Sequence, residues 1–176
     1  REFSKNGGTF EMVQLWVNLP KKHKGEQPHY QGITAGQIQK VTLSGNAGLV
    51  NIIAGNYADV KGAADTYTPV NLFDVKLKKD GTVNFNIPAT HNTALLVING
   101  AVIIDGQTAA EHSFVLFAND GEELTIKAET DAVLLLLSGE PINEPIVSYG
   151  PFVMNTEEEI YEAIQEFKSG KYGVLV

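Results

Sequence analysis

The chain has 176 residues, of which 43% are hydrophobic, so it can bury a sizeable core in one domain and still carry additional segments. Cysteine is absent, which excludes disulfide bonds, thiolate metal ligands and cysteine nucleophiles. The formal net charge of -8 argues against nucleic-acid binding through phosphate contacts, and no apolar stretch approaches the roughly 20 residues that span a bilayer.

The first 40 residues contain an apolar run followed by an irregular stretch. The run FEMVQLWVNL, which holds the only Trp of the sequence, predicts a strand over residues 10–18. Residues 20–40 show no periodicity, and about 20 residues without secondary structure are unusual inside a compact domain, so we interpret them as a linker. Because the chain does not open with Met and the strand has no evident partner, we expect residues 1–19 to be the remnant of a missing N-terminal domain.

Residues 41–140 contain short runs of β-forming residues separated by turn residues, which is typical of an all-β sandwich or barrel. Asn99-Gly100 lies between ALLVI and AVIID and predicts a hairpin with a type I′ turn, since both central residues of that turn need φ > 0. The run VNLFDVKL alternates as a half-buried strand does, whereas AVLLLLSG does not, so we expect both of its faces to be covered. The predicted strands are 10–18, 41–45, 49–55, 70–78, 82–87, 93–98, 101–105, 112–118, 123–128 and 132–138.

Residues 141–176 contain one predicted helix, in the run NTEEEIYEAIQEFKSGKYG. Thr156 and Glu159 form a capping box at its start, and Gly170 follows its last turn. Apolar residues at helical spacing form a stripe that must be buried, either on the barrel of this chain or on a neighbouring domain; they are Ile160, Ala163, Ile164 and Phe167.

The histidines are the first candidates for chemistry, and the sequence has four. His23 and His29 fall in the predicted linker, where we expect them in solvent. His91 stands alone at the mouth of a strand, and we expect it to be a rim residue. His112 follows Glu111, and because adjacent strand residues point to opposite faces, the pair cannot easily reach one ion.

The carboxylates and the known motifs add no stronger site. Glu157–Glu159 read as the charged first turn of the helix, whereas Asp105 and Glu111 lie near strand ends and could face a barrel mouth. The sequence has no phosphate-binding loop, dinucleotide fingerprint, His-Glu-x-x-His or Gly-x-Ser-x-Gly motif. We therefore predict no catalytic, cofactor-binding or metal-ligating residue in this chain.

Several runs together resemble the pirin family. They are VQLWVNLP (13–20), QPHYQ (27–31) and SGEPINEPIVSYGPFVMNTEEEIYEAIQEFKSGKYG (138–173), of which GPFVMNT with the capped helix is the most specific. The resemblance covers nearly the whole sequence but only the later part of a pirin. It implies an all-β fold: a cupin jelly-roll barrel over residues 41–140, the second half of a bicupin, followed by a crossing segment with one C-terminal α-helix over 141–176.

The resemblance also implies where metal would and would not be bound. In pirins three His and one Glu hold the metal, usually iron, in the first barrel, upstream of QLWVNL, so those ligands have no counterpart here. In this sequence PATHNTALLVING stands where a metal cupin has His-x-His and a following Glu, and HSFVLFANDGEELTIKA lacks the second-motif His inside the barrel. We expect iron in the missing N-terminal cupin and no cofactor or metal in this chain.

Two functions remain open from the sequence. The full-length protein could be a cytoplasmic metal-dependent dioxygenase of the quercetin 2,3-dioxygenase type, with this part structural and inactive alone. Alternatively, it could be a non-catalytic protein-binding or transcription-cofactor-like regulatory module. The expected partners are the N-terminal cupin of the same protein, other proteins, and other copies of this segment through its uncovered apolar side chains, with no direct nucleic-acid or membrane contact.

Overall fold

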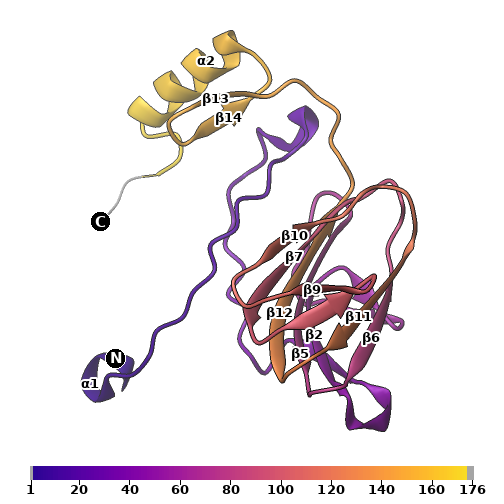
Figure 1. Ribbon diagram of the computed structural model, residues 1–176. Helices are drawn as coiled ribbons and strands as arrows, with labels where there is room; N and C mark the ends of the chain where they lie inside the picture. The colour runs from indigo at the N-terminus through magenta and orange to yellow at the C-terminus, as the bar shows by residue number, and fades with distance from the viewer. Residues whose placement is uncertain (1, 174–176) are drawn as a thin grey trace. The chain divides into compact units, whose positions relative to one another are not determined.

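A computed structural model describes residues 2–173 of the chain. The chain divides into two compact units, which are treated separately (Figure 1). The barrel unit comprises Glu26–Asn143, and the terminal unit comprises the residues up to Gly25 together with those from Glu144 on. No helix of the described part is long and apolar enough to cross a membrane.

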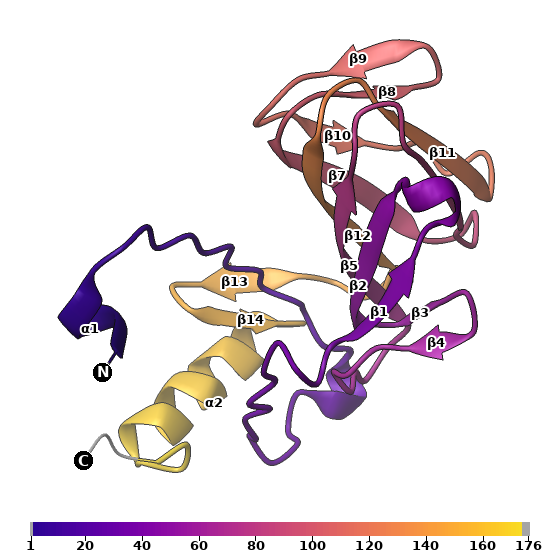
Figure 2. The same ribbon diagram turned by 90° about the horizontal axis from the view of Figure 1, so that it is seen from below.

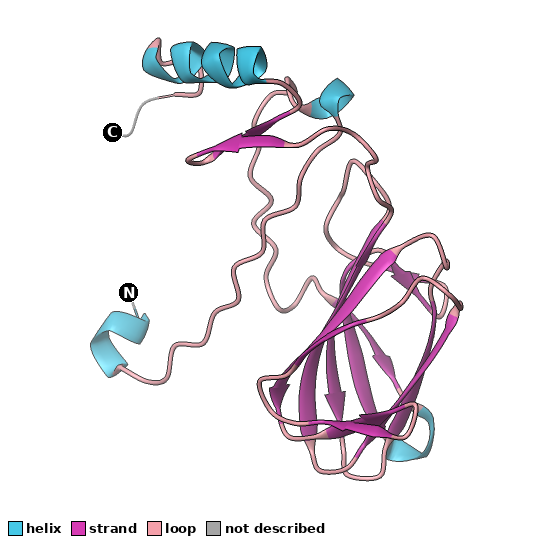
Figure 3. Ribbon diagram, turned by 45° about the horizontal axis from the view of Figure 1, so that its top comes forward, coloured by secondary structure: helices cyan, strands magenta, loops and turns pink. Residues whose placement is uncertain are grey.

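Two antiparallel sheets face each other in the barrel unit (Figure 3). The larger has the order β1 (Gln39–Thr42), β2 (Gly48–Ala54), β5 (Val70–Leu77), β12 (Ala132–Gly139), β7 (Asn92–Asn99) and β10 (Phe114–Leu116). The smaller has the order β6 (Thr82–Asn86), β11 (Glu123–Ala128), β8 (Val102–Ile104) and β9 (Gln107–Ala109). The short strands β3 (Asn56–Tyr57) and β4 (Val60–Lys61) pair separately, and Ser44–Asn46 form a 3-10 turn. This arrangement confirms the predicted all-β barrel.

The connections correct the predicted Asn99-Gly100 hairpin. From β5 to β12 the chain passes repeatedly from one sheet to the other, so β7 and β8, on either side of Gly100, do not pair with each other. Gly100 has a φ of 80° and turns the chain between sheets, whereas Asn99 is not among the residues with positive φ. Two-residue turns with positive φ at both positions do occur, at Ala58-Asp59 between β3 and β4 and at Asp105-Gly106 between β8 and β9.

The core of the barrel unit lies between the two sheets. Along β12, Leu134 and Leu136 are fully buried and face inward, where their partners on β5 and β7 include Phe73 and Leu95. Phe73 and Phe85 stack with ring centroids 5.7 Å apart, so both sheets contribute aromatic rings to one cluster. On the outer face of β12 only Leu135 is buried, so the expected cover of both faces is confirmed at its centre but not along its whole length.

The terminal unit contains the predicted helix. The hairpin of β13 (Val147–Tyr149) and β14 (Phe152–Met154) lies beside α2 (Glu157–Lys168), as Figure 2 shows. The capping box is present, because the Thr156 side chain accepts from the Glu159 backbone N–H and the Glu159 carboxylate accepts from the Thr156 backbone N–H. Ile160 and Ala163 are buried, so half of the apolar stripe is covered.

The predicted strand over residues 10–18 does not form within the described residues, and its assignment to a missing upstream domain stays a prediction. The described N-terminal residues form α1 (Glu2–Asn6), an extended segment without strand pairing, and a 3-10 turn at Lys21–His23. A strand needs a neighbour for its backbone N–H and C=O groups, and the described residues place none beside this segment. Its large apolar side chains are 45–71% exposed; they are Phe10, Met12, Val13, Leu15, Trp16 and Val17.

Candidate functional site

A pocket of about 420 Å³ opens at the end of the barrel where β7 and β11 begin and β8 ends. Its wall comes from the loop before β7, the β8–β9 hairpin and the β10–β11 loop. His91 and Thr93 line it from β7 and the residues before it, Asp105 from the hairpin, and Phe117 and Asn119 from the last loop. The pocket therefore lies within the barrel unit and combines apolar and polar side chains.

His91 lies at the barrel end just before β7, where a rim residue is expected, but its side chain is buried in the pocket wall, at 8% exposure. Its Nδ1 lies 3.2 Å from Ser138 Oγ, and Asn71 Nδ2 donates to the same oxygen at 2.9 Å. Asn71, Ser138 and Thr93 are register partners on β5, β12 and β7, and Ser138 lies two positions beyond the inward-facing Leu136. The inward face of the larger sheet thus ends in a polar layer at the pocket.

The sequence contains a pattern that predicts this polar layer. Ser138 follows Leu134 and Leu136 at the spacing of one strand face, and Asn71 precedes Phe73 and Val75 in the same way. Polar residues at positions that continue an inward apolar row mark the end of a core. Their association with His91 could not be read in this way, because it depends on pairing between strands far apart in the sequence.

The pocket residues do not fit a bound metal ion. Among residues 2–173, no three His, Cys, Asp or Glu side chains converge as a metal site requires. The Nδ1 atom of His91 is already engaged with Ser138. Asp105 does line the pocket, as one of the expected possibilities, but Glu111 instead accepts from Asn99 Nδ2 at 3.0 Å and from the Gly100 backbone N–H at 3.1 Å.

The other histidines lie away from the pocket. Glu111 and His112 do not lie in a strand, so the prediction that they point to opposite strand faces is wrong. Strand β10 begins only at Phe114, and His112 has a φ of 65°. His112 Nε2 lies 3.8 Å from Glu111 Oε1, with its side chain 81% exposed. His29 is exposed, as expected, with its ring 6.2 Å from that of Tyr67.

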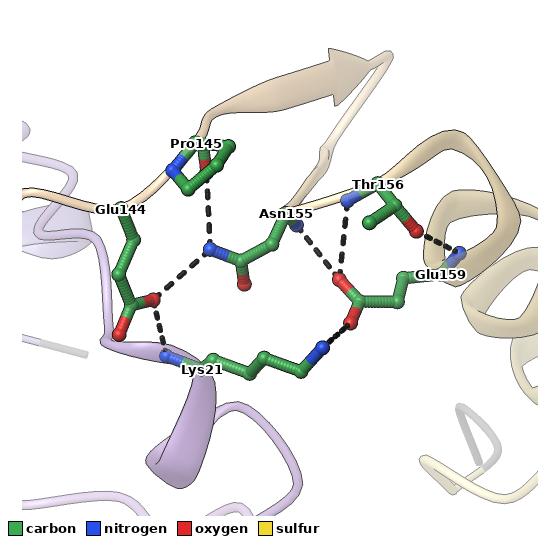
Figure 4. Close-up of polar contacts among 6 residues, drawn as sticks. All are labelled: Lys21, Glu144, Pro145, Asn155, Thr156 and Glu159. Carbon is green, nitrogen blue, oxygen red and sulfur yellow. Dashed lines mark hydrogen bonds and ion pairs between the residues drawn. The ribbon is translucent and has the colours of Figure 1, made fainter.

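A second polar cluster lies in the terminal unit (Figure 4). Lys21 donates from its backbone N–H to Glu144 Oε2 at 2.7 Å and pairs through Nζ with Glu159 Oε1 at 2.6 Å. Asn155 donates from its side chain to Glu144 Oε2 at 3.0 Å and from its backbone N–H to Glu159 Oε2 at 2.8 Å, beside the cap residue Thr156. The cluster joins the 3-10 turn to the start of α2.

This cluster makes the stability of the terminal unit depend on pH. The hydrogen bond from Lys21, reinforced by the backbone N–H of Asn155, lowers the pKa of Glu159 below its ordinary value of 4.5. A carboxylate whose pKa is lower in the folded state contributes stability above its unfolded pKa and loses that contribution as the pH falls through its folded pKa. We therefore expect amide-exchange protection of α2 to decrease as the pH is lowered below about 4.5.

The matched variants are Glu159→Gln and Glu158→Gln, which remove one negative charge each from the same helical turn. Glu159→Gln should abolish most of the acid-dependent change, whereas Glu158→Gln should retain it. Equal pH profiles for the two variants, measured by hydrogen exchange corrected for intrinsic rates, would contradict the assignment to Glu159.

Comparisons with known proteins identify relatives over almost the whole chain. The family described as "Pirin C-terminal cupin domain" matches residues 72–173. A Pseudomonas aeruginosa protein named "Putative quercetin 2,3-dioxygenase" is 41% identical over 170 residues, which cover 97% of this chain and 59% of that protein. The mouse protein named "Pirin" is 37% identical over 166 residues, covering 92% of this chain and 57% of its own length.

Solved structures agree with these matches. A quercetin 2,3-dioxygenase from Acinetobacter baumannii is 43% identical and superposes with a TM-score of 0.92, over 99% of this chain and 61% of that one. A Geobacillus kaustophilus protein is 27% identical with a TM-score of 0.68, over 74% of this chain and 54% of its own. The chain thus spans about three fifths of the length of the first curated relatives it matches, 59% and 58% for two of them.

Proposed function

This chain belongs to the pirin family and has the fold of its C-terminal cupin domain, and from that premise we propose that it is the structural, metal-free part of a longer protein. The full-length protein is a metal-dependent dioxygenase of the quercetin 2,3-dioxygenase type, with iron held by its N-terminal cupin. Similarity to proteins that carry this name supports the proposed activity.

The packed core between the two sheets of the barrel unit is the observation that carries the structural role. Side chains from both sheets occupy the space between them, including Phe73, Phe85, Leu95 and Leu134, all at most 3% exposed. The polar layer at the pocket contains one imidazole, that of His91, and its Nδ1 atom is hydrogen-bonded to the Ser138 hydroxyl. Metal centres need three or four converging donors, and the described residues supply no such set.

The exposed apolar side chains within residues 12–17 indicate where this part contacts another domain. Trp16 is 66% exposed and Met12 67%, although side chains of this kind are usually buried. In the full-length protein these side chains pack on the N-terminal cupin. In the isolated chain they drive self-association, because apolar surface without cover favours contact between copies.

The test compares the full-length protein with the 176-residue chain. Iron content and oxygen uptake with quercetin should both be present in the full-length protein and absent from the chain, because the proposed ligands lie outside it. Stoichiometric iron on the isolated chain would overturn the metal-free role. Iron without quercetin-dependent oxygen uptake in the full-length protein would instead favour a non-catalytic, protein-binding role.

A further inference from the structure

A chain of hydrogen bonds in the barrel unit ends at Nδ1 of His91. The Asn56 backbone N–H donates to Asn71 Oδ1 at 3.4 Å, which leaves the Asn71 amide nitrogen directed at Ser138 Oγ, 2.9 Å away. Ser138 accepts that bond, and its own hydroxyl hydrogen has one acceptor among the described residues, His91 Nδ1 at 3.2 Å. In the tautomer that satisfies this hydroxyl hydrogen, Nδ1 accepts and the ring hydrogen is on Nε2.

This leaves a donor at the pocket. His91 lines the cavity and is more than nine-tenths buried, and its Nε2 has no partner within residues 2–173. The buried side-chain atoms without a partner in the described residues do not include Nε2, so this nitrogen is accessible from the pocket, where water or a ligand can accept from it. The interior end of the pocket is thus prepared for a hydrogen-bond acceptor.

The outer part of the pocket has the opposite character. Four carboxylates line it, Asp105, Asp120, Glu122 and Glu123, and its described lining includes no Lys or Arg. Carboxylates accept hydrogen bonds and repel anions, so this rim suits a ligand with donor groups and no negative charge. Since no set of side chains within residues 2–173 converges to hold a metal ion, a metal cation does not fit the same space.

The remaining wall is apolar. Ile87, Ile104, Val115, Phe117 and Leu124 line the cavity. Such walls favour a ring with apolar faces, and the volume of about 420 Å³ falls within the usual range for small-molecule sites, roughly 300–1,000 Å³. A hydroxyl group can both accept from His91 and donate to the rim carboxylates, which a purely anionic or purely cationic group cannot do.

We propose that this pocket is a second binding site of the protein, for a neutral ring compound with several hydroxyl groups and about the size of a sugar. One hydroxyl oxygen accepts from His91 Nε2, others donate to the rim carboxylates, and the ring face rests on the apolar wall around Phe117. This site needs neither the N-terminal cupin nor the dioxygenase activity, so its test is independent of the proposed function.

The test is an NMR titration of the ¹⁵N-labelled chain. Long-range ¹H–¹⁵N spectra of the imidazoles should show His91 with its hydrogen on Nε2. D-glucose and myo-inositol should shift the His91 ring and the backbone signals of Thr93, Thr108 and Asn119 along saturable curves, with Kd on the order of 1 mM. D-glucuronate, which carries a carboxylate on the same pyranose ring, should bind at least about tenfold more weakly than D-glucose.

Variants connect the shifts to the proposed contacts. His91→Phe removes the donor from the ring and should weaken binding about tenfold or more, whereas His29→Phe, the same change on an exposed His outside the pocket, should leave it unchanged. Ser138→Ala removes the hydroxyl that selects the tautomer and should shift hydrogen from Nε2 to Nδ1 while weakening binding, which provides a readout even if His91→Phe does not fold.

Three results would overturn the proposal. They are shifts that grow linearly without saturation, a folded His91→Phe variant that binds both probes as the unmodified chain does, and D-glucuronate binding as tightly as D-glucose. A Ser138→Ala variant with the original tautomer and unchanged affinity would likewise show that the hydrogen-bond chain does not prepare the site.

Discussion

Replacing Phe73 with alanine should lower the free energy of unfolding of the barrel unit by about 3–5 kcal/mol. Phe73 is 2% exposed, and its ring lies 5.9 Å from that of Tyr57 and 5.7 Å from that of Phe85. The substitution loses the transfer free energy of the ring and leaves a cavity between the two sheets, which stiff antiparallel strands cannot close by small movements. Urea denaturation followed by fluorescence and circular dichroism measures the loss.

Phe114→Ala is the matched control. Phe114 lies in β10, at the edge of the larger sheet, and is 63% exposed, so removal of its ring should change the free energy of unfolding by about 1 kcal/mol or less. Similar losses for the two variants would mean that the cluster of Tyr57, Phe73 and Phe85 does not form the centre of the core.

Gly100→Ala should destabilise the barrel unit by roughly 2–5 kcal/mol, from two causes. Gly100 has a φ of 80°, which costs a residue with a side chain roughly 1–2 kcal/mol. A Cβ atom there would also press against the Asp131 carbonyl oxygen and lie 2.9 Å from Thr130 Oγ1 and 3.0 Å from Ala132 Cα. Relief of this crowding requires movement of the backbone that leads into β12, one of the two central strands of the larger sheet.

Gly106→Ala separates the two causes. Gly106 has a φ of 74°, but a Cβ atom there would meet nothing within 4 Å. It should lose only the conformational part, roughly 1–2 kcal/mol, in the same denaturation experiment. Equal losses of unfolding free energy for Gly100→Ala and Gly106→Ala would contradict this prediction. They would mean that the backbone around Asp131 moves away from the new Cβ atom without a cost in free energy.

Features that depend on neighbours along the chain could be predicted well. Helix α2 begins where Thr156 and Glu159 predict, because a capping box involves residues three positions apart. Strands β5, β11 and β12 agree with their predicted ranges to within one residue at each end, since alternation and turn residues are also local signals. The short strands β3, β4, β9, β13 and β14 were not predicted, because two or three residues carry too little periodicity.

Features that depend on pairing between distant strands could not be predicted. Asn99-Gly100 has the composition of a hairpin turn, yet in a jelly roll the strands on its two sides belong to different sheets. Residues 10–18 have the composition of a strand, yet none of the described segments pairs with them. Local propensity indicates which secondary structure a segment can adopt. Whether a strand forms depends on a neighbouring strand that pairs with its backbone N–H and C=O groups.

The amino-acid sequence was sufficient for the fold class, the capped helix and the family. The burial of His91, its attachment through Ser138 to Asn71, and the pocket that its free nitrogen lines depend on the folded chain. The reason is separation along the sequence: these three residues come from β5, β12 and the loop before β7, and strand register alone brings them within hydrogen-bonding distance.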